Sequence, residues 1–194
     1  SASRPPLKEV LAKWTRSARR MAEKAGVEVR YGTAVTGAMI ASGAPETVIL
    51  ASGALPSAPP IPGIDGEVVR DARDVLTGKT ETKSPAVVLG AGYVGMETAD
   101  FLMERGVAVT VLEMSAAPPV PSFTAHGYWL HRRLKKGGRL VLGARVTSID
   151  ADGVRFEMDG KESSEPAAMV VTALGARSER DLEEACAAAG CPCV

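Results

Sequence analysis

The chain has 194 residues, which is enough for one large domain or two small domains with a buried core. Its 23 Lys and Arg residues balance its 23 Asp and Glu residues, so the formal net charge is zero. A neutral chain argues against a general nucleic-acid or anionic-membrane surface, because both need an excess of basic residues. The longest apolar runs, such as residues 86–92, are too short to span a bilayer.

The first predicted element is an amphipathic helix over residues 7–25. Val10, Trp14 and Met21 fall on one side at helical spacing, while lysines and arginines fall on the other. We interpret the basic side as a solvated face rather than as a site for an anionic partner. Residues 27–31 then alternate between apolar and polar side chains, which predicts a short strand.

A strand of the buried type is predicted over residues 46–51. Four prolines follow between residues 55 and 63, and this density excludes a helix or a central strand. We interpret the proline-rich stretch as a stiff connection and expect a domain boundary between about Gly66 and Ser84.

From Pro85 onward the pattern becomes strand, glycine turn, helix and strand, which is typical of a βαβ unit with parallel strands. Short alternating runs later in the chain, punctuated by Asp-Gly pairs, predict a β-meander. The predicted fold is therefore α/β, with a Rossmann-like parallel sheet and a β-meander crossover. Its predicted strands cover residues 86–89, 107–112, 139–142, 145–149, 154–158 and 168–173, and its helices cover 96–105 and 125–136.

The glycine turn between the first strand and the helix carries the predicted chemistry. In the run Gly90-Ala91-Gly92-Tyr93-Val94-Gly95, Gly90 permits a tight turn and Gly92 lets the backbone approach a diphosphate. Gly95 lets the helix pack closely on the strand. The backbone N–H groups of Tyr93 and Val94 then face the phosphates with the positive end of the helix dipole. This arrangement predicts a dinucleotide site.

Glu113 is predicted to select NAD(H) over NADP(H). It ends the second strand 21 residues beyond Gly92, where an acidic residue accepts hydrogen bonds from the ribose hydroxyls of adenosine. A 2′-phosphate there would meet the carboxylate, with a repulsion of about 4 kcal/mol at a separation of roughly 4 Å. The segment from Met114 to Thr124 contains no Arg or Lys that could neutralise such a phosphate.

The remaining polar residues predict no catalytic group. Glu97 lies in the first turn of the helix, where a carboxylate is favoured by the dipole alone, so both a structural and a functional role stay open. His126 and His131 have no partner at a catalytic spacing, and we interpret them as surface or core histidines. No Ser–His–Asp arrangement or metal cluster can be assembled from the sequence.

Three cysteines, Cys186, Cys191 and Cys193, fall within the last nine residues. The spacing of Cys191-Pro192-Cys193 is too tight for a redox CxxC motif, and the favoured interpretation is a fraying terminus. Metal ligation and disulfide chemistry remain the alternatives. The chain has no disulfide framework, so we expect a reducing, cytoplasmic location.

The chain resembles the flavoprotein disulfide reductase superfamily. Within it, the chain is most similar to the C-terminal pyridine-nucleotide half of NADH:flavin oxidoreductases of the 2,4-dienoyl-CoA reductase and trimethylamine dehydrogenase type. The residues that carry the resemblance are 48–54 with 59–63, 71–79, 87–106 with 109–114, and 170–175.

The resemblance implies that Gly90 to Gly95 and Glu113 bind NAD(H), with Met114 beside the acid. It places the backbone of Ala173, Leu174 and Gly175, and the side chain of Glu97, near the nicotinamide. It also implies that residues 67–175 are the NAD(H)-binding domain, while 1–66 and 176–194 are a truncated remnant of an FAD-type domain. The turn at 51–53 reads Ala-Ser-Gly, where the family has Ala-Thr-Gly.

Departures from the family lead us to interpret the chain as a fragment. The first FAD-binding glycine motif, the later Gly-Asp flavin motif, the barrel with FMN and the cysteine-bound iron–sulfur cluster are expected only in the full-length protein. The expected function is to position NADH for hydride transfer to a flavin, and we expect the isolated chain to be inactive. A non-catalytic NAD(H)-binding or sensing module, or part of another FAD-dependent pyridine nucleotide-disulfide oxidoreductase, remains the alternative.

Overall fold

The computed structural model describes residues 4–6, 8 and 10–194. Its contacts divide the chain into two units. The sheet unit comprises Pro56–Gly175 with the described part of Ser1–Thr15, and the helical unit comprises Arg16–Leu55 with Ala176–Val194. Each unit is considered by itself below.

A five-stranded parallel sheet forms the centre of the sheet unit. Its strand order is β2-β9-β3-β4-β5, and every neighbouring pair is parallel. This topology confirms the predicted α/β class with a Rossmann-like parallel sheet. The strands are β2 (Val69–Asp71), β3 (Ala86–Leu89), β4 (Val109–Glu113), β5 (Gly138–Leu142) and β9 (Met169–Thr172).

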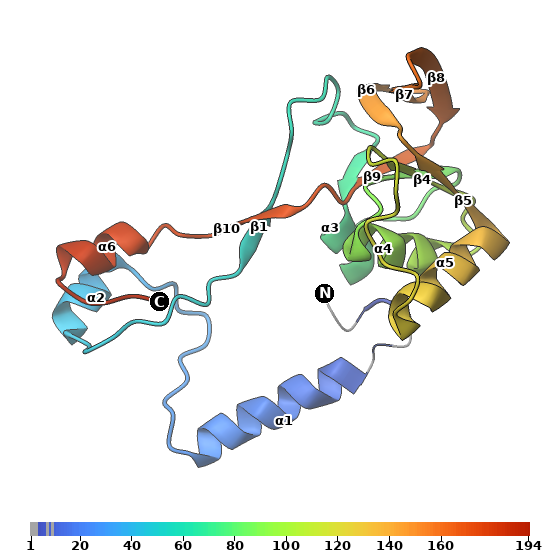
Figure 1. The fold of residues 1–194 in the computed structure, drawn as a ribbon. Helices are drawn as coiled ribbons and strands as arrows, with labels where there is room; N and C mark the ends of the chain where they lie inside the picture. Colours follow the sequence, from blue (N-terminus) through green and yellow to red (C-terminus); the bar gives the residue numbers. More distant parts are fainter. Residues whose placement is uncertain (1–3, 7, 9) are drawn as a thin grey trace. The chain divides into compact units, whose positions relative to one another are not determined.

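Three helices cover one face of this sheet: α3 (Ala72–Thr77), α4 (Tyr93–Met103) and α5 (Ala125–Gly137). Figure 1 shows them side by side below the strands. Val88 and Val111 of the sheet share one buried cluster with Met96 and Leu102 of α4 and Leu130 of α5. Because α4 directly follows β3, this packing fixes the start of α4 against the end of the strand.

An antiparallel meander covers the other face. It consists of β6 (Arg145–Asp150), β7 (Gly153–Met158) and β8 (Lys161–Pro166). Val87 and Leu89, which alternate with Val88 along β3, pack in a cluster that includes Phe156 of the meander. Since both faces are covered, all four residues of β3 are buried, as is typical of a parallel sheet.

The prediction of which strands form the meander is wrong for two strands. Residues 139–142 belong to β5, which extends the parallel sheet by pairing with β4 rather than joining the antiparallel strands. The third strand of the meander is β8, whose sequence Lys-Glu-Ser-Ser-Glu-Pro lacks an apolar alternation. β8 lies at the edge of the meander, where most of its residues are exposed. Its position is set by backbone pairing with β7 rather than by burial of its side chains.

In the helical unit, α2 (Gly37–Gly43) packs against α6 (Glu183–Ala188). Ile40 of α2 and Cys186 of α6 are buried in one small cluster. Strands β1 (Ala54–Pro56) and β10 (Ala176–Ser178) form a separate two-stranded sheet.

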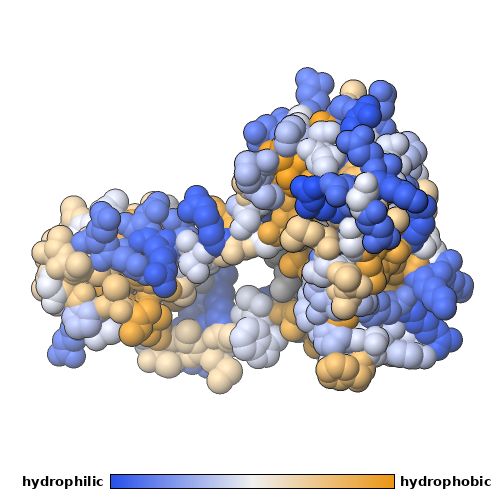
Figure 2. All heavy atoms as spheres, turned by 45° about the horizontal axis from the view of Figure 1, so that its top comes forward, coloured by the Kyte–Doolittle hydropathy of each residue, from blue (hydrophilic) through white to orange (hydrophobic). Residues whose placement is uncertain are grey.

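The predicted N-terminal helix is confirmed as α1 (Val10–Lys24), although Leu7, which was included in it, lies outside the described residues. None of the residues of α1, all of which are described, is buried. Trp14 and Met21 are each 70% exposed. On the face of the molecule that is seen in Figure 2, hydrophobic residues are interspersed with hydrophilic ones. None of the described residues therefore covers the apolar stripe of α1.

Two predicted strands before the proline-rich stretch are wrong. Residues 27–31 are irregular, and within 46–51 only Val48 forms a bridge, to Cys193. Ile49 is 77% exposed, so the apolar run at 46–51 does not enter a sheet core. A strand needs a neighbouring strand to hydrogen-bond its backbone N–H and C=O groups. Within the described chain, residues 27–31 have no such neighbour and residues 46–51 have only the short bridge at Val48.

No helix among the described residues has the length and apolar character needed to cross a membrane.

Candidate nucleotide-binding site

The glycine turn lies at the carboxyl edge of the parallel sheet, between β3 and α4. Strands β4 and β9 flank β3, so their carboxyl ends meet the turn from both sides. Gly90 has φ +96°, and a Cβ added there would lie 2.7 Å from the carbonyl oxygen of Ala173. Gly90 is therefore required both by its backbone conformation and by the close approach of the segment that follows β9.

The other two glycines differ in what surrounds them. A Cβ on Gly95 would lie 1.9 Å from the carbonyl oxygen of Gly90, so only glycine lets α4 pack this closely on the turn. A Cβ on Gly92 would meet nothing within 4 Å. Gly92 thus faces open space, which leaves its backbone accessible to a ligand.

The first two residues of α4 are exposed to solvent. Gly92 is the N-cap residue, and no side chain caps the helix there. The first backbone bond of the helix runs from the N–H of Met96 to the carbonyl of Gly92, at 2.9 Å. Tyr93 and Val94 are 43% and 49% exposed, and their N–H groups precede this first bond. This end of α4 can therefore donate hydrogen bonds to an anion.

Glu113 lies beside the turn, at the end of β4. Its Oε2 accepts a hydrogen bond from the N–H of Ala91 and its Oε1 accepts one from the N–H of Ser115, both at 2.8 Å. Burial by itself raises the pKa of Glu113, but these backbone hydrogen bonds outweigh it and the net pKa is lowered. The carboxylate is therefore ionised at neutral pH and tied directly to the glycine turn. Met114, next in the chain, is 69% exposed.

Residues 173–175 complete the edge of the site. The N–H of Ala173 donates to the carbonyl of Leu89 at 2.9 Å, which continues the pairing of β9 with β3. Leu174 packs against the cluster between the sheet and the meander, and Gly175 turns the chain with φ +93°. The structure thus brings Ala173 against the turn that contains Gly90.

Glu97 has partners that the sequence did not indicate. Its side chain is nearly buried, and its Oε1 forms an ion pair with Lys8 and lies 2.8 Å from His126 Nε2. The ring of His126 stacks on the ring of Tyr93, with centroids 5.6 Å apart and planes 9° from parallel. His126 and Lys8 are thus the site residues that sequence reasoning missed. They lie 29 and 89 residues from Glu97, so no local spacing could have signalled the contact.

His131 stays outside this group, since its Nε2 bonds to the carbonyl of Val120 at 2.8 Å. In the part of the chain that the structure describes, no group of three or more His, Cys, Asp or Glu side chains could hold a metal ion.

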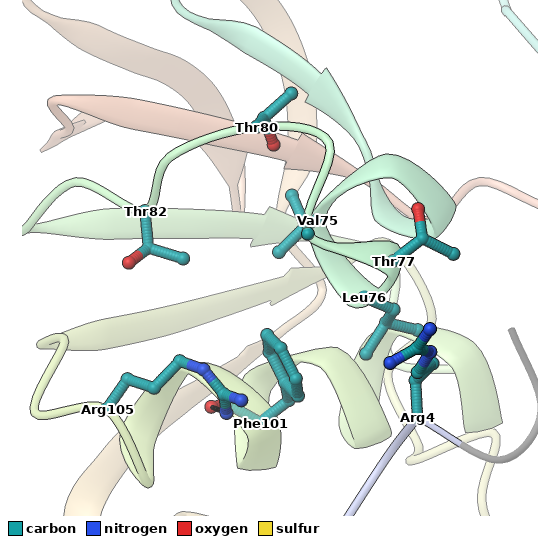
Figure 3. Close-up of a pocket in the computed structure, with 9 residues that line it drawn as sticks. Arg4, Val75, Leu76, Thr77, Thr80, Thr82, Phe101 and Arg105 are labelled. Carbon is teal, nitrogen blue, oxygen red and sulfur yellow. Dashed lines mark hydrogen bonds between the residues drawn. The ribbon is translucent and has the colours of Figure 1, made fainter.

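A separate pocket of about 450 Å³ lies at the other end of α4 (Figure 3). Phe101, in the last turns of α4, forms part of its wall, and the guanidinium of Arg105 lies 3.4 Å from the centroid of the Phe101 ring. None of the residues predicted to hold the cofactor lines this pocket. The lining residues are Arg4, Val75, Leu76, Thr77, Gly78, Thr80, Thr82, Phe101 and Arg105.

Comparison with known proteins places the chain in a family. The family described as "Pyridine nucleotide-disulphide oxidoreductase" matches residues 44–193. A bilirubin reductase from Mediterraneibacter gnavus is 34% identical over 177 residues, which cover 91% of this chain and 28% of the relative. The chain thus spans less than a third of the length of this curated relative.

Two solved structures extend the comparison. A 2-naphthoyl-CoA reductase in complex with 2-naphthoyl-CoA superposes with a TM-score of 0.85 at 27% identity, covering 95% of this chain and 28% of that one. The water-forming NADH oxidase from Lactobacillus brevis, bound to NADH, superposes with a TM-score of 0.56 at 28% identity, covering 72% of this chain and 32% of that one. In both comparisons the superposed part is about a third or less of the solved chain.

Proposed function

The chain belongs to the pyridine nucleotide-disulphide oxidoreductase family, and from this premise we propose that its sheet unit binds NADH and positions it for hydride transfer to a flavin. The observation that carries the proposal is the uncapped start of α4, with an ionised Glu113 at the end of the neighbouring strand. The likeness to an NADH oxidase bound to NADH supports the choice of ligand.

The diphosphate of NADH is assigned to the first turn of α4. The N–H groups of Tyr93 and Val94 donate to its oxygens, and the positive end of the helix dipole favours the negative charge. Gly92 supports this assignment, because the open space beside it lets a phosphate reach the backbone without meeting a side chain.

The adenosine ribose is assigned to Glu113. Its two oxygens are oriented by hydrogen bonds from the N–H groups of Ala91 and Ser115, and a carboxylate can accept further hydrogen bonds from ribose hydroxyls. The same carboxylate disfavours a 2′-phosphate, so the site is specific for NADH over NADPH. Exposed Met114 lies beside it and brings no positive charge.

The nicotinamide end is assigned to Glu97 and to residues 173–175, as the family resemblance implies. Glu97 is held by Lys8 and His126, and the ring of His126 in turn stacks on the ring of Tyr93, so the carboxylate has a fixed position near the start of α4. NADH supplies the hydride and the flavin accepts it, while the residues of this chain orient the nicotinamide.

We further assign the chain to the NADH:flavin oxidoreductases of the 2,4-dienoyl-CoA reductase and trimethylamine dehydrogenase type. Its likeness to a 2-naphthoyl-CoA reductase over 95% of the chain supports this assignment. Residues 67–175 are then the NAD(H) domain, and residues 1–66 and 176–194 belong to an FAD domain. Other residues of that FAD domain would cover the exposed apolar stripe of α1. In a full-length cytoplasmic enzyme, FMN and an iron–sulfur cluster would continue the electron path, and the isolated chain would be inactive.

Calorimetric titration of the chain with NADH and with NADPH tests the binding step. We expect saturable binding of NADH and at least tenfold weaker binding of NADPH, because about 1.4 kcal/mol of the carboxylate repulsion already gives a factor of ten. Thr80→Ala, in the separate pocket, is the matched control and leaves the NADH affinity unchanged. Absence of NADH binding, or equal affinity for the two nucleotides, contradicts the proposal.

A further inference from the structure

The three cysteines lie together in the core of the helical unit. Cys186, in α6, is fully buried, Cys191 is 8% exposed, and both belong to one cluster with Ile40. Cys193 packs against this cluster and is half-buried. The expectation of a fraying terminus is therefore wrong, because the described thiols share one packed environment.

Backbone hydrogen bonds hold the segment that carries Cys191 and Cys193. The N–H of Cys191 donates to the carbonyl of Cys186 at 2.9 Å, which ties the segment to α6. Further along, the N–H of Val48 donates to the carbonyl of Pro192 at 2.9 Å, and the N–H of Val194 donates to the carbonyl of Val48 at 3.1 Å. The backbone on both sides of Cys193 is thus fixed.

Cys193 packs against the cluster that contains Cys186, whereas the thiol of Cys191 is engaged by a backbone carbonyl. The Cys191 Sγ donates to the carbonyl of Pro45 at 3.2 Å. Burial raises the pKa of Cys186, and the neighbouring Cys193 thiol raises this pKa further. Cys186 is therefore held as a thiol beside the more accessible Cys193.

We propose that Cys186 and Cys193 are a dithiol pair that a low-molecular-weight disulfide oxidises reversibly to an intramolecular disulfide. The pair joins α6 to the segment that bridges Val48, so the new bond would lock a contact which only hydrogen bonds and packing hold in the reduced state.

The exchange proceeds in two steps. The Cys193 thiolate attacks one sulfur of the small disulfide, forms a mixed disulfide and releases one small thiolate, which takes up the proton that Cys193 lost. Cys186 then loses its proton, and its thiolate displaces the second small thiolate from the Cys193 sulfur. The protein loses two hydrogen atoms in total, and the small disulfide is reduced to two thiols.

Burial and exposure set this order. Cys193 reacts first because it is the most exposed of the three cysteines, all of which the structure describes. Cys186 reacts second and only slowly at neutral pH, because its raised pKa leaves a small thiolate fraction that grows about tenfold per pH unit.

Treatment of the reduced chain with oxidised glutathione, followed by peptide mapping in a mass spectrometer, tests the proposal. We expect one intramolecular disulfide between Cys186 and Cys193, which dithiothreitol reverses and which forms faster as the pH rises. A disulfide that contains Cys191, or three thiols that all remain free after prolonged oxidation, overturns it.

Single variants separate the roles of the three thiols. Cys191→Ser is the matched control and keeps the disulfide. Cys186→Ser stops the reaction at one glutathione adduct on Cys193, and Cys193→Ser gives no disulfide. Because Cys186 is fully buried, Cys186→Ala serves as a second variant, and circular dichroism checks that both are folded. Loss of the disulfide in Cys191→Ser, or disulfide formation in a folded Cys193→Ser variant, contradicts the assigned pair.

Discussion

Replacing Gly95 by alanine is expected to destabilise the chain and to abolish NADH binding with it. The new Cβ would lie 1.9 Å from the backbone carbonyl oxygen of Gly90, so α4 must move away from the turn. Overpacking of this kind costs roughly 1–3 kcal/mol, and the backbone position of the clash places this variant at the upper end. The fall in the free energy of unfolding is measured by urea denaturation followed by circular dichroism.

Gly92→Ala is the matched control for this prediction. The Gly92 backbone, with φ −65° and ψ 176°, suits any residue, and a Cβ there meets nothing within 4 Å. We therefore expect stability to change by less than about 1 kcal/mol, while NADH binding weakens because the methyl group stands where the diphosphate approaches. Equal destabilisation by the two variants, or full NADH affinity in Gly92→Ala, would refute the different roles given to the two glycines.

Replacing Glu113 by arginine is expected to reverse the nucleotide preference. The substitution removes the acceptor of the ribose hydroxyls and the charge that repels a 2′-phosphate, and it introduces a guanidinium that can pair with that phosphate. A hydrogen bond to a charged group contributes roughly 1.5–3 kcal/mol, so NADH affinity should fall by about tenfold or more. NADPH affinity should rise, and calorimetry with both nucleotides measures the change.

Glu113→Gln isolates the contribution of charge. The carboxylate also accepts hydrogen bonds from the N–H groups of Ala91 and Ser115, so arginine leaves both without their partner. Glutamine keeps one carbonyl acceptor at the same place, and it should weaken discrimination against NADPH without reversing it. An unchanged preference in a folded Glu113→Arg variant would remove this residue from the ribose site.

The elements nearest to the glycine turn could be predicted because their signals are local. The apolar run of β3, the glycines and the apolar strand β4 follow one another within 30 residues, and each requirement is visible in the sequence. The structure adds the reason why Gly95 must be glycine, namely the carbonyl of Gly90 against which α4 packs.

The contacts around Glu97 could not be predicted, because they join distant parts of the chain. Lys8 and His126 reach the same carboxylate oxygen from the N-terminal segment and from α5, and neither position carries a motif. Strand β8 was missed for a different reason, since its backbone pairs with β7 while its side chains stay mostly exposed. In both cases the deciding interaction is tertiary, and local periodicity does not report it.

The most direct test of the account is to record amide correlation spectra of the chain during titration with NADH. If the start of α4 holds the diphosphate, the amide signals of Gly92, Tyr93 and Val94 shift together and saturate with the calorimetric affinity. Saturable shifts confined to residues 77–82, around the separate pocket, or to the helical unit would show that the nucleotide binds elsewhere and would contradict the account.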